Sequence, residues 1–163
     1  MQEYLFVLGR DFELSLAEII SYFKSNKIPF ELKKYDKDAV LLLLPELDFN
    51  YLINRLGGTV KIAKVESERL DKEYIKGIIS GFRYNKIIIS FSKLSNNNFA
   101  ESFVYELKRA LRKNKIKFII KEDAPPSKLS SLNVLERGFD FVIYRDNIAR
   151  TICVSNPKLF KRR

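Results

Sequence analysis

The second half of the sequence contains a run of basic side chains whose chemistry is the binding of phosphate. Between residues 108 and 121 there are seven Lys and Arg residues and no Asp or Glu. Those at positions 108, 109, 112 and 113 are spaced by three and four residues, so they share one side of a helix, where like charges repel one another. A polyanion would relieve this repulsion, because each phosphate neutralised by Lys or Arg releases condensed counterions.

The candidate binding residues extend beyond this run. An extended basic surface on a folded domain is the usual footprint of nucleic-acid binding. The alternative interpretation of the run is a solvated helix end whose cations compensate the helix dipole. A membrane surface is a competing anionic partner, but no segment combines a basic face with an exposed apolar anchor. The side chains that we predict to contact nucleic-acid phosphates are Lys108, Arg109, Arg112, Lys113, Lys117, Lys121, Lys128, Arg137 and Arg150.

A few other residues could take part in binding or chemistry. Tyr84, Tyr105 and Tyr144 are candidates for stacking on unpaired bases, although such residues more often lie in a core or at its rim. Cys153 has apolar neighbours, and we expect a small core residue rather than a nucleophile. The pair Gly57-Gly58 could approach a phosphate, but a helix end followed by a turn explains it more simply.

The residues of common catalytic and metal sites are missing from the sequence. There is no His, which removes imidazole acid–base catalysis and the Ser-His-Asp triad, and a single Cys leaves a structural zinc without ligands. No glycine-rich nucleotide-binding loop occurs. Asp123 and Asp146 have no partner carboxylate at a recognisable spacing, so solvated loop acids are the ordinary explanation. We therefore expect no metal and no cofactor in this chain, and a stand-alone enzyme is the least favoured hypothesis.

The charge of the chain divides it into two parts. Residues 1–66 contain 9 Lys and Arg against 10 Asp and Glu, whereas residues 67–163 contain 21 against 10. A chain of 163 residues can bury one good core or two small ones. We predict domains at residues 1–66 and 67–163. The single Cys, the lack of a signal peptide and the lack of a membrane-spanning apolar run predict a cytoplasmic protein with no membrane partner.

The elements of the first part follow the order strand, helix, strand, strand, helix, strand. Ser15 is the expected N-cap of the first helix, with Glu18 at the third position after it, as in a capping box. Asp48 is the expected cap of the second helix, which Gly57-Gly58 closes. This order is the ferredoxin-like arrangement. The elements are expected at residues 3–8, 15–26, 30–35, 39–44, 48–56 and 59–66.

The second part predicts a mixed α/β domain. The near-continuous apolar run at residues 86–91 indicates a strand buried on both faces. The long helix that ends at Asn114 has an apolar stripe that includes Phe103, Leu107 and Leu111, beside its basic face. The fold class is therefore α+β, a ferredoxin-like domain followed by a mixed α/β domain. We expect helices at residues 70–81 and 99–114, and strands at 86–91, 116–121, 130–135, 139–144 and 148–154.

Several segments, in their order and spacing, resemble the N-terminal region of the archaeal and eukaryotic tRNA guanosine N2-methyltransferases. They are YLFVLGRDFELSLAEI (Tyr4–Ile19), LGGTVKIAKV (Leu56–Val65), GIISGF (Gly77–Phe82) and LSSLNVLERGFDFVIY (Leu129–Tyr144). The ending at Ala149–Arg163 resembles the family's junction with the catalytic domain. These enzymes carry a ferredoxin-like domain, then a THUMP domain, then a Rossmann-type methyltransferase domain.

The resemblance implies that residues 67–163 form a THUMP-like domain that binds the acceptor stem and single-stranded 3′ end of tRNA. Residues 1–66 would then be a spacer between that end and the methylated base. The family's catalytic motif, Asp/Asn-Pro-Pro-aromatic, and its glycine-rich S-adenosylmethionine loop are absent, since Asn156-Pro157 is followed by Lys-Leu. S-adenosylmethionine would therefore be bound by a methyltransferase domain elsewhere, in cis or as a separate subunit. The alternative is a scaffold that docks a separate methyltransferase chain without binding RNA.

Overall fold

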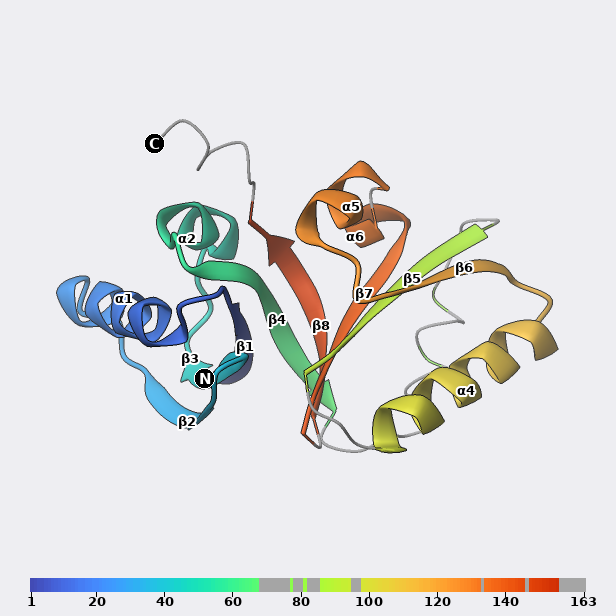
Figure 1. The fold of residues 1–163 in the computed structure, drawn as a ribbon, viewed down its shortest axis with the longest axis horizontal. Coiled ribbons are helices and arrows are strands. Elements are labelled where there is room, and N and C mark those ends of the chain that lie inside the picture. Colours follow the sequence, from blue (N-terminus) through green and yellow to red (C-terminus); the bar gives the residue numbers. More distant parts are fainter. Residues whose placement is uncertain are drawn as a thin grey trace. The chain divides into compact units, whose positions relative to one another are not determined.

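The protein forms two compact units in a computed structural model, which describes residues 1–67, 77, 81, 86–94, 98–132, 134–145 and 147–155 (Figure 1). The first unit contains Met1–Val65 together with the chain from Thr151 on, and the second unit is Glu66–Arg150. The predicted second domain spans residues 67–163, whereas in the structure the chain from Thr151 on groups with the first unit. The expected helix at residues 70–81, apart from Gly77 and Gly81, lies outside the described residues.

The first unit has the predicted ferredoxin-like arrangement. Its strands lie in the order β2-β3-β1-β4, and each neighbouring pair is antiparallel. Asp48 caps α2 as predicted, because its carboxylate accepts the Tyr51 backbone N–H at 3.0 Å. The elements are β1 (Gln2–Leu8), α1 (Phe12–Ser25), β2 (Glu31–Tyr35), β3 (Ala39–Leu44), α2 (Phe49–Arg55) and β4 (Thr59–Ser67).

The core of the first unit lies between the sheet and its two helices. Alternate residues of β1 and β3, such as Phe6 and Leu42, are fully buried against α1 and α2. The rings of Phe6 and Phe23 meet edge to face with their centroids 6.1 Å apart. Cys153, near the end of the last strand, packs into the same core. The last strand therefore completes a core that is formed mostly by the first 65 residues.

The first helix begins earlier than predicted. Its N-cap is Asp11, whose carboxylate accepts the Leu14 N–H at 3.1 Å. Ser15 lies inside the first turns and donates its hydroxyl to the Asp11 carbonyl at 2.7 Å. Both residues are good capping types, but only Asp11 precedes the helical backbone. The predicted capping box of Ser15 and Glu18 is therefore wrong, and Glu18 has another partner described below.

The second unit is built around a central parallel strand. Strand β5 pairs in parallel with β6 on one side and with β7 on the other, and β7 pairs antiparallel with β8. Helix α4 covers one face of these strands and buries Phe103, Leu107 and Leu111 against β5 and β7 (Figure 1). The elements are β5 (Lys86–Lys93), α4 (Asn98–Lys113), β6 (Lys117–Glu122), α5 (Pro126–Ser131), α6 (Val134–Arg137), β7 (Gly138–Tyr144) and β8 (Asn147–Val154).

The described residues of the segment predicted as a strand at residues 130–135 belong mostly to two short helices. Helix α5 begins at Pro126, and α6 follows almost directly. Proline favours the first turn of a helix, since its missing N–H would have no helical partner there. Leu129 and Val134 are the buried side chains of these two short helices. The predicted strand is therefore wrong, and each of the two short helices buries one apolar side chain.

Candidate nucleic-acid interface

The described residues of the two units differ in charge. In the first unit they include nine Lys and Arg and nine Asp and Glu, a net charge of zero. In the second unit they include thirteen basic and seven acidic residues, a net charge of +6. The basic character noted in the sequence is therefore retained in the second unit, even though the chain from Thr151 on belongs to the first.

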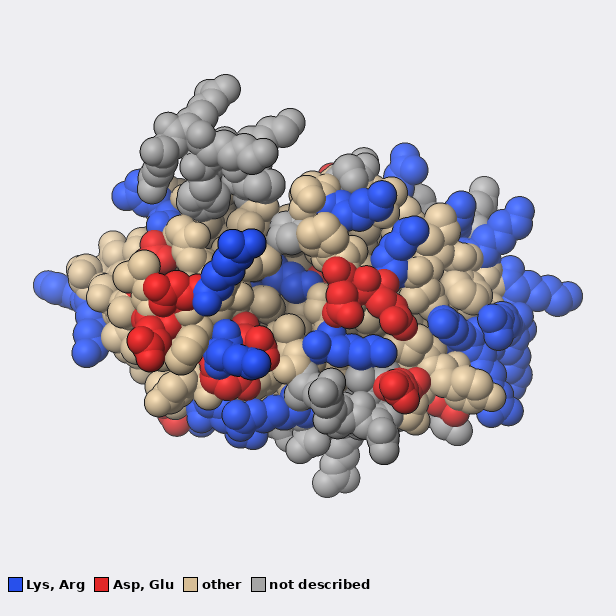
Figure 2. Space-filling model, in the orientation of Figure 1, with Lys and Arg blue, Asp and Glu red and all other residues tan. Residues whose placement is uncertain are grey.

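Helix α4 presents the densest group of cations. Its buried stripe leaves Arg109, Arg112 and Lys113 exposed on the outward side, with Lys108 half-buried at the border. Figure 2 shows Lys and Arg side chains gathered over the C-terminal end of this helix. In the part of the chain that the structure describes, no carboxylate lies within ion-pair distance of Arg109, Arg112 or Lys113. These cations are available to an external anion.

The helix dipole explains part of this charge. Arg112 and Lys113 lie in the last turn of α4, where the negative end of the dipole favours cations. The helix ends there because Lys115 adopts a left-handed backbone with φ of 55° and donates its N–H to the Arg112 carbonyl at 3.1 Å. Arg109 lies a turn earlier, where the helix dipole contributes little to the stabilisation of a cation. Dipole compensation therefore does not explain the whole group.

The strands divide the predicted RNA-binding residues between two faces. Phe118 and Ile120 of β6 pack against the core beneath α4, so the alternate residues Lys117 and Lys121 point to the opposite face. Helices α5 and α6 lie on that opposite side of β5 and β7 (Figure 1). The predicted single surface is therefore two surfaces. The α4 face carries Lys108, Arg109, Arg112, Lys113 and Arg150, and the α5/α6 face carries Lys117, Lys121, Lys128 and Arg137.

Arg150 belongs to the α4 face because of its strand register. It pairs with Phe141, which packs into the core beneath α4. Its guanidinium carbon lies 4.4 Å from the centroid of the Phe139 ring, which is a cation–π distance. The side chain is exposed, so its remaining donors face solvent. The aromatic ring positions this cation without neutralising it.

Sequence analysis missed one cation of the α5/α6 face. Lys86 begins β5 and pairs in parallel register with Lys117 of β6, and both side chains are exposed. Neighbouring strands lie about 4.8 Å apart, so the two positive charges repel each other. An anion between them would remove this cost. No local signal identifies Lys86, because its proximity to Lys117 depends on strand register.

Two of the three candidates for base stacking are described by the structure, and they differ in burial. Tyr144 is fully buried, so this prediction is wrong, because β7 runs through the core of the second unit. Tyr84 lies outside the described residues. Tyr105 is 64% exposed on α4. The structure therefore leaves Tyr105 as the described candidate for contact with a base.

Cys153 is a core residue, as expected. It is 3% exposed and its thiol donates to the Phe49 carbonyl at 3.4 Å. Burial raises the pKa of this thiol to about 12, so the thiolate needed for nucleophilic attack is scarce near neutral pH. Among the described residues, no group of three or more Cys, Asp and Glu side chains is placed to hold a metal ion. No helix in the described ranges is long and apolar enough to cross a membrane.

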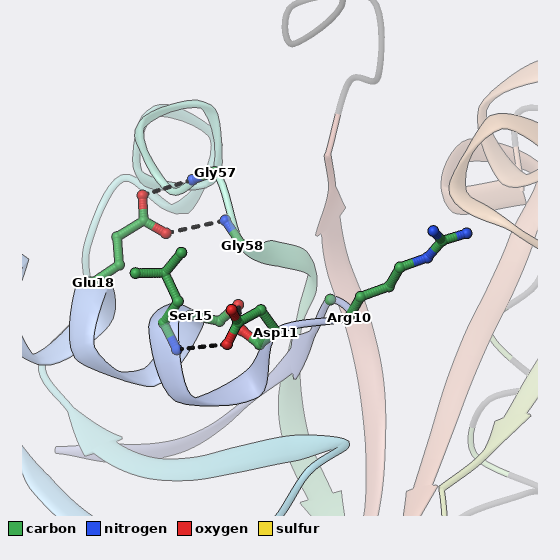
Figure 3. A pocket seen from close by; sticks show the side chains of 8 residues that line it. Arg10, Asp11, Ser15, Glu18, Gly57 and Gly58 are labelled. Carbon is green, nitrogen blue, oxygen red and sulfur yellow. Dashed lines mark hydrogen bonds between the residues drawn. The ribbon is translucent and has the colours of Figure 1, made fainter.

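The first unit has a pocket of about 470 Å³ between the start of α1 and the Gly57-Gly58 segment (Figure 3). The Glu18 carboxylate accepts the backbone N–H groups of Gly57 and Gly58 at 2.8 and 3.0 Å. A phosphate at these glycines would have to displace that carboxylate. Arg10 extends away from this network (Figure 3). The Glu18 carboxylate and the backbone N–H groups of Gly57 and Gly58 are therefore already hydrogen-bonded to one another.

Gly58 has a structural reason that differs from the predicted helix end and turn. Helix α2 ends at Arg55, and neither glycine has a positive φ. A Cβ on Gly58 would lie 2.8 Å from the Ser15 Cβ and closer still to its hydroxyl. Gly58 is therefore required by the close approach of α1, not by a left-handed turn.

Comparison with known proteins shows similarity of fold. No protein-family model matches the chain, and no curated protein matches it. PH1313 from Pyrococcus horikoshii Ot3 is 10% identical, with a TM-score of 0.55 over 96% of this chain and 56% of that one. A 4-thiouridine synthetase in complex with RNA and bound ATP is 12% identical, with a TM-score of 0.49 over 93% of this chain and 40% of that one. A possible methylase from Clostridium difficile 630 is 13% identical, with a TM-score of 0.39 over 92% of this chain and 40% of that one.

The similarity to PH1313 supports the predicted α+β fold over nearly the whole chain. This chain spans 40 to 56% of the length of the three solved structures.

Proposed function

We propose that this chain binds tRNA and that its second unit makes the contacts. The observation that carries the proposal is the α4 face, where exposed cations have no carboxylate partner among the described residues. Such a surface repels itself in isolation and is stabilised by a polyanion, whose condensed counterions are released on binding. The balanced charge of the first unit's described residues supports a positioning role for it.

The RNA element that we propose is the acceptor end of tRNA, bound by a THUMP-like second unit. The chain would be the tRNA-binding part of a tRNA guanosine N2-methyltransferase. A separate domain or subunit would bind S-adenosylmethionine and transfer the methyl group, in the cytoplasm. Support for this finer assignment is the sequence resemblance of the segments from Tyr4 to Tyr144. Phosphate contacts position a substrate and carry little base specificity, so the choice of nucleoside would belong to the catalytic partner.

Removal of the 3′ CCA of tRNA is expected to weaken binding about tenfold, because bases of the single-stranded end each contribute on the order of 1 kcal/mol or more when they are held. Filter binding of the full chain to intact tRNA and to tRNA without CCA measures this. Equal affinity for the two RNAs would contradict the acceptor-end assignment. No affinity for either RNA, with co-purification of a methyltransferase chain, would instead support the scaffold alternative.

A further inference from the structure

Tyr105 places an apolar ring where the fold gives it no role. The core-facing residues of α4 are Phe103, Val104, Leu107 and Leu111, all buried. At 100° per residue, Tyr105 lies on the side of the helix away from this stripe. Its ring is 64% exposed, the highest exposure of any aromatic side chain that the structure describes. The ring therefore contributes little to the core of the second unit.

Most of the surface of Tyr105 is exposed to solvent. Among the described residues, neither an aromatic ring nor a cation is in contact with Tyr105. Tyr51 of the first unit differs from Tyr105 in this respect, because the Arg55 guanidinium lies 5.8 Å from the centroid of the Tyr51 ring. Tyr105 thus retains a flat apolar surface that is open to a ligand.

On the same side of α4, Glu101 lies one turn before Tyr105, and the two turns that follow carry cations. Arg109 follows Tyr105 by four residues and Arg112 by seven, so the three side chains lie in a row along the helix. Helical side chains lean toward the N-terminus, which directs Arg109 toward the turn that carries Tyr105. An exposed ring next to two cations without carboxylate partners is suited to a ligand that has both an aromatic plane and negative charges.

We propose that Tyr105 stacks on an unpaired nucleobase while Arg109 and Arg112 bind the adjacent phosphates. This inference rests on the proposed tRNA binding and adds a site for one single-stranded nucleotide. Bases inside a duplex already stack on each other, so a protein ring is useful only where a base is unpaired. In tRNA bound at its acceptor end, such bases lie in the single-stranded 3′ terminus. The site would contribute preference for that terminus, which phosphate contacts alone do not give.

The test combines protein variants with RNA truncation. Wild type, Tyr105→Ala, Tyr105→Phe and Tyr51→Ala are each measured against intact tRNA and tRNA without CCA. We expect Tyr105→Ala to bind intact tRNA about tenfold more weakly and truncated tRNA as wild type does. Tyr105→Phe keeps the ring and should bind as wild type. Tyr51→Ala is the matched control, because Tyr51 is a 55% exposed helical tyrosine in the other unit.

Two results would overturn the stacking site while leaving tRNA binding intact: unchanged affinity of Tyr105→Ala for intact tRNA, or an equal loss on both RNAs. Absence of tRNA binding by the wild type would overturn the stacking site together with the proposed function. A tRNA with 2-aminopurine as its terminal purine gives an independent signal, since stacking quenches its fluorescence. Tyr105→Phe should retain the quenching caused by wild type, and Tyr105→Leu should lose it. The urea midpoints of the variants should match, because the ring is exposed.

Discussion

Replacement of Arg109 and Arg112 by Glu is expected to weaken tRNA binding on the order of a hundredfold at about 0.1 M salt. Both side chains are exposed on α4, and neither has a carboxylate partner in the described structure. Each reversal removes a cation that can contact phosphate and adds an anion that repels it. The affinity should fall for intact and truncated tRNA, because phosphate contacts act on any sequence. Filter binding of the double variant measures the loss.

The matched control is the double variant Lys24→Glu and Lys37→Glu. These side chains are exposed in the first unit, and Lys24 lies in the last turn of α1 as Arg112 does in α4. The two double variants therefore change the net charge equally, and each places one Glu at the negative end of a helix dipole, where it lowers stability by a similar amount. We expect the control to weaken binding by less than about threefold, because these cations are not among the proposed phosphate contacts and salt screens long-range charge effects. An equal loss in both double variants would show that total charge, not the α4 face, determines affinity.

The largest expected effect on stability comes from Gly138→Ala. Gly138 pairs with Ile88 where β7 begins beside β5. An added Cβ would lie 2.6 Å from the Ile88 carbonyl carbon and closer still to its oxygen. Backbone atoms of a paired strand cannot give way as a flexible side chain can, so the strands must separate locally. We expect the free energy of unfolding to fall by about 3 kcal/mol, measured by urea denaturation.

Gly77→Ala is the control for this substitution. A Cβ at Gly77 would meet no atom within 4 Å, and the residue is exposed and helical. Alanine is the better helix former, so stability should be unchanged or rise by up to about 1 kcal/mol. A similar loss in both variants would contradict the argument from the β5–β7 contact.

The first unit was largely predictable because its signals are local. Apolar strand segments such as Ala39–Leu44 and the Asp48 cap identify the ferredoxin-like order without knowledge of distant contacts. The start of α1 was missed because Asp11 and Ser15 are both good caps, and the backbone between them decides the matter. The reason for Gly58 was also hidden, since it depends on the approach of α1 from 43 residues earlier in the sequence.

The candidate site was predictable in composition but not in geometry. Helical spacing correctly placed Arg109 and Arg112 on an outward face of α4. Alternation along β6 puts Lys117 on the other face of the sheet, and register puts Lys86 next to it. The exposure of Tyr105 and the burial of Tyr144 follow from which elements pack together. Sequence periodicity indicates a side of an element, but only the pairing of elements determines what that side meets.

The central claim, that the second unit binds the phosphates of tRNA, is tested most directly by the salt dependence of wild-type binding. If five to nine cations contact phosphate, log affinity should fall linearly with log salt with a slope between about −3 and −8. The Arg109 and Arg112 double variant should have a slope smaller in magnitude by about 2. A slope near zero, or no tRNA binding at about 50 mM salt, would contradict the account.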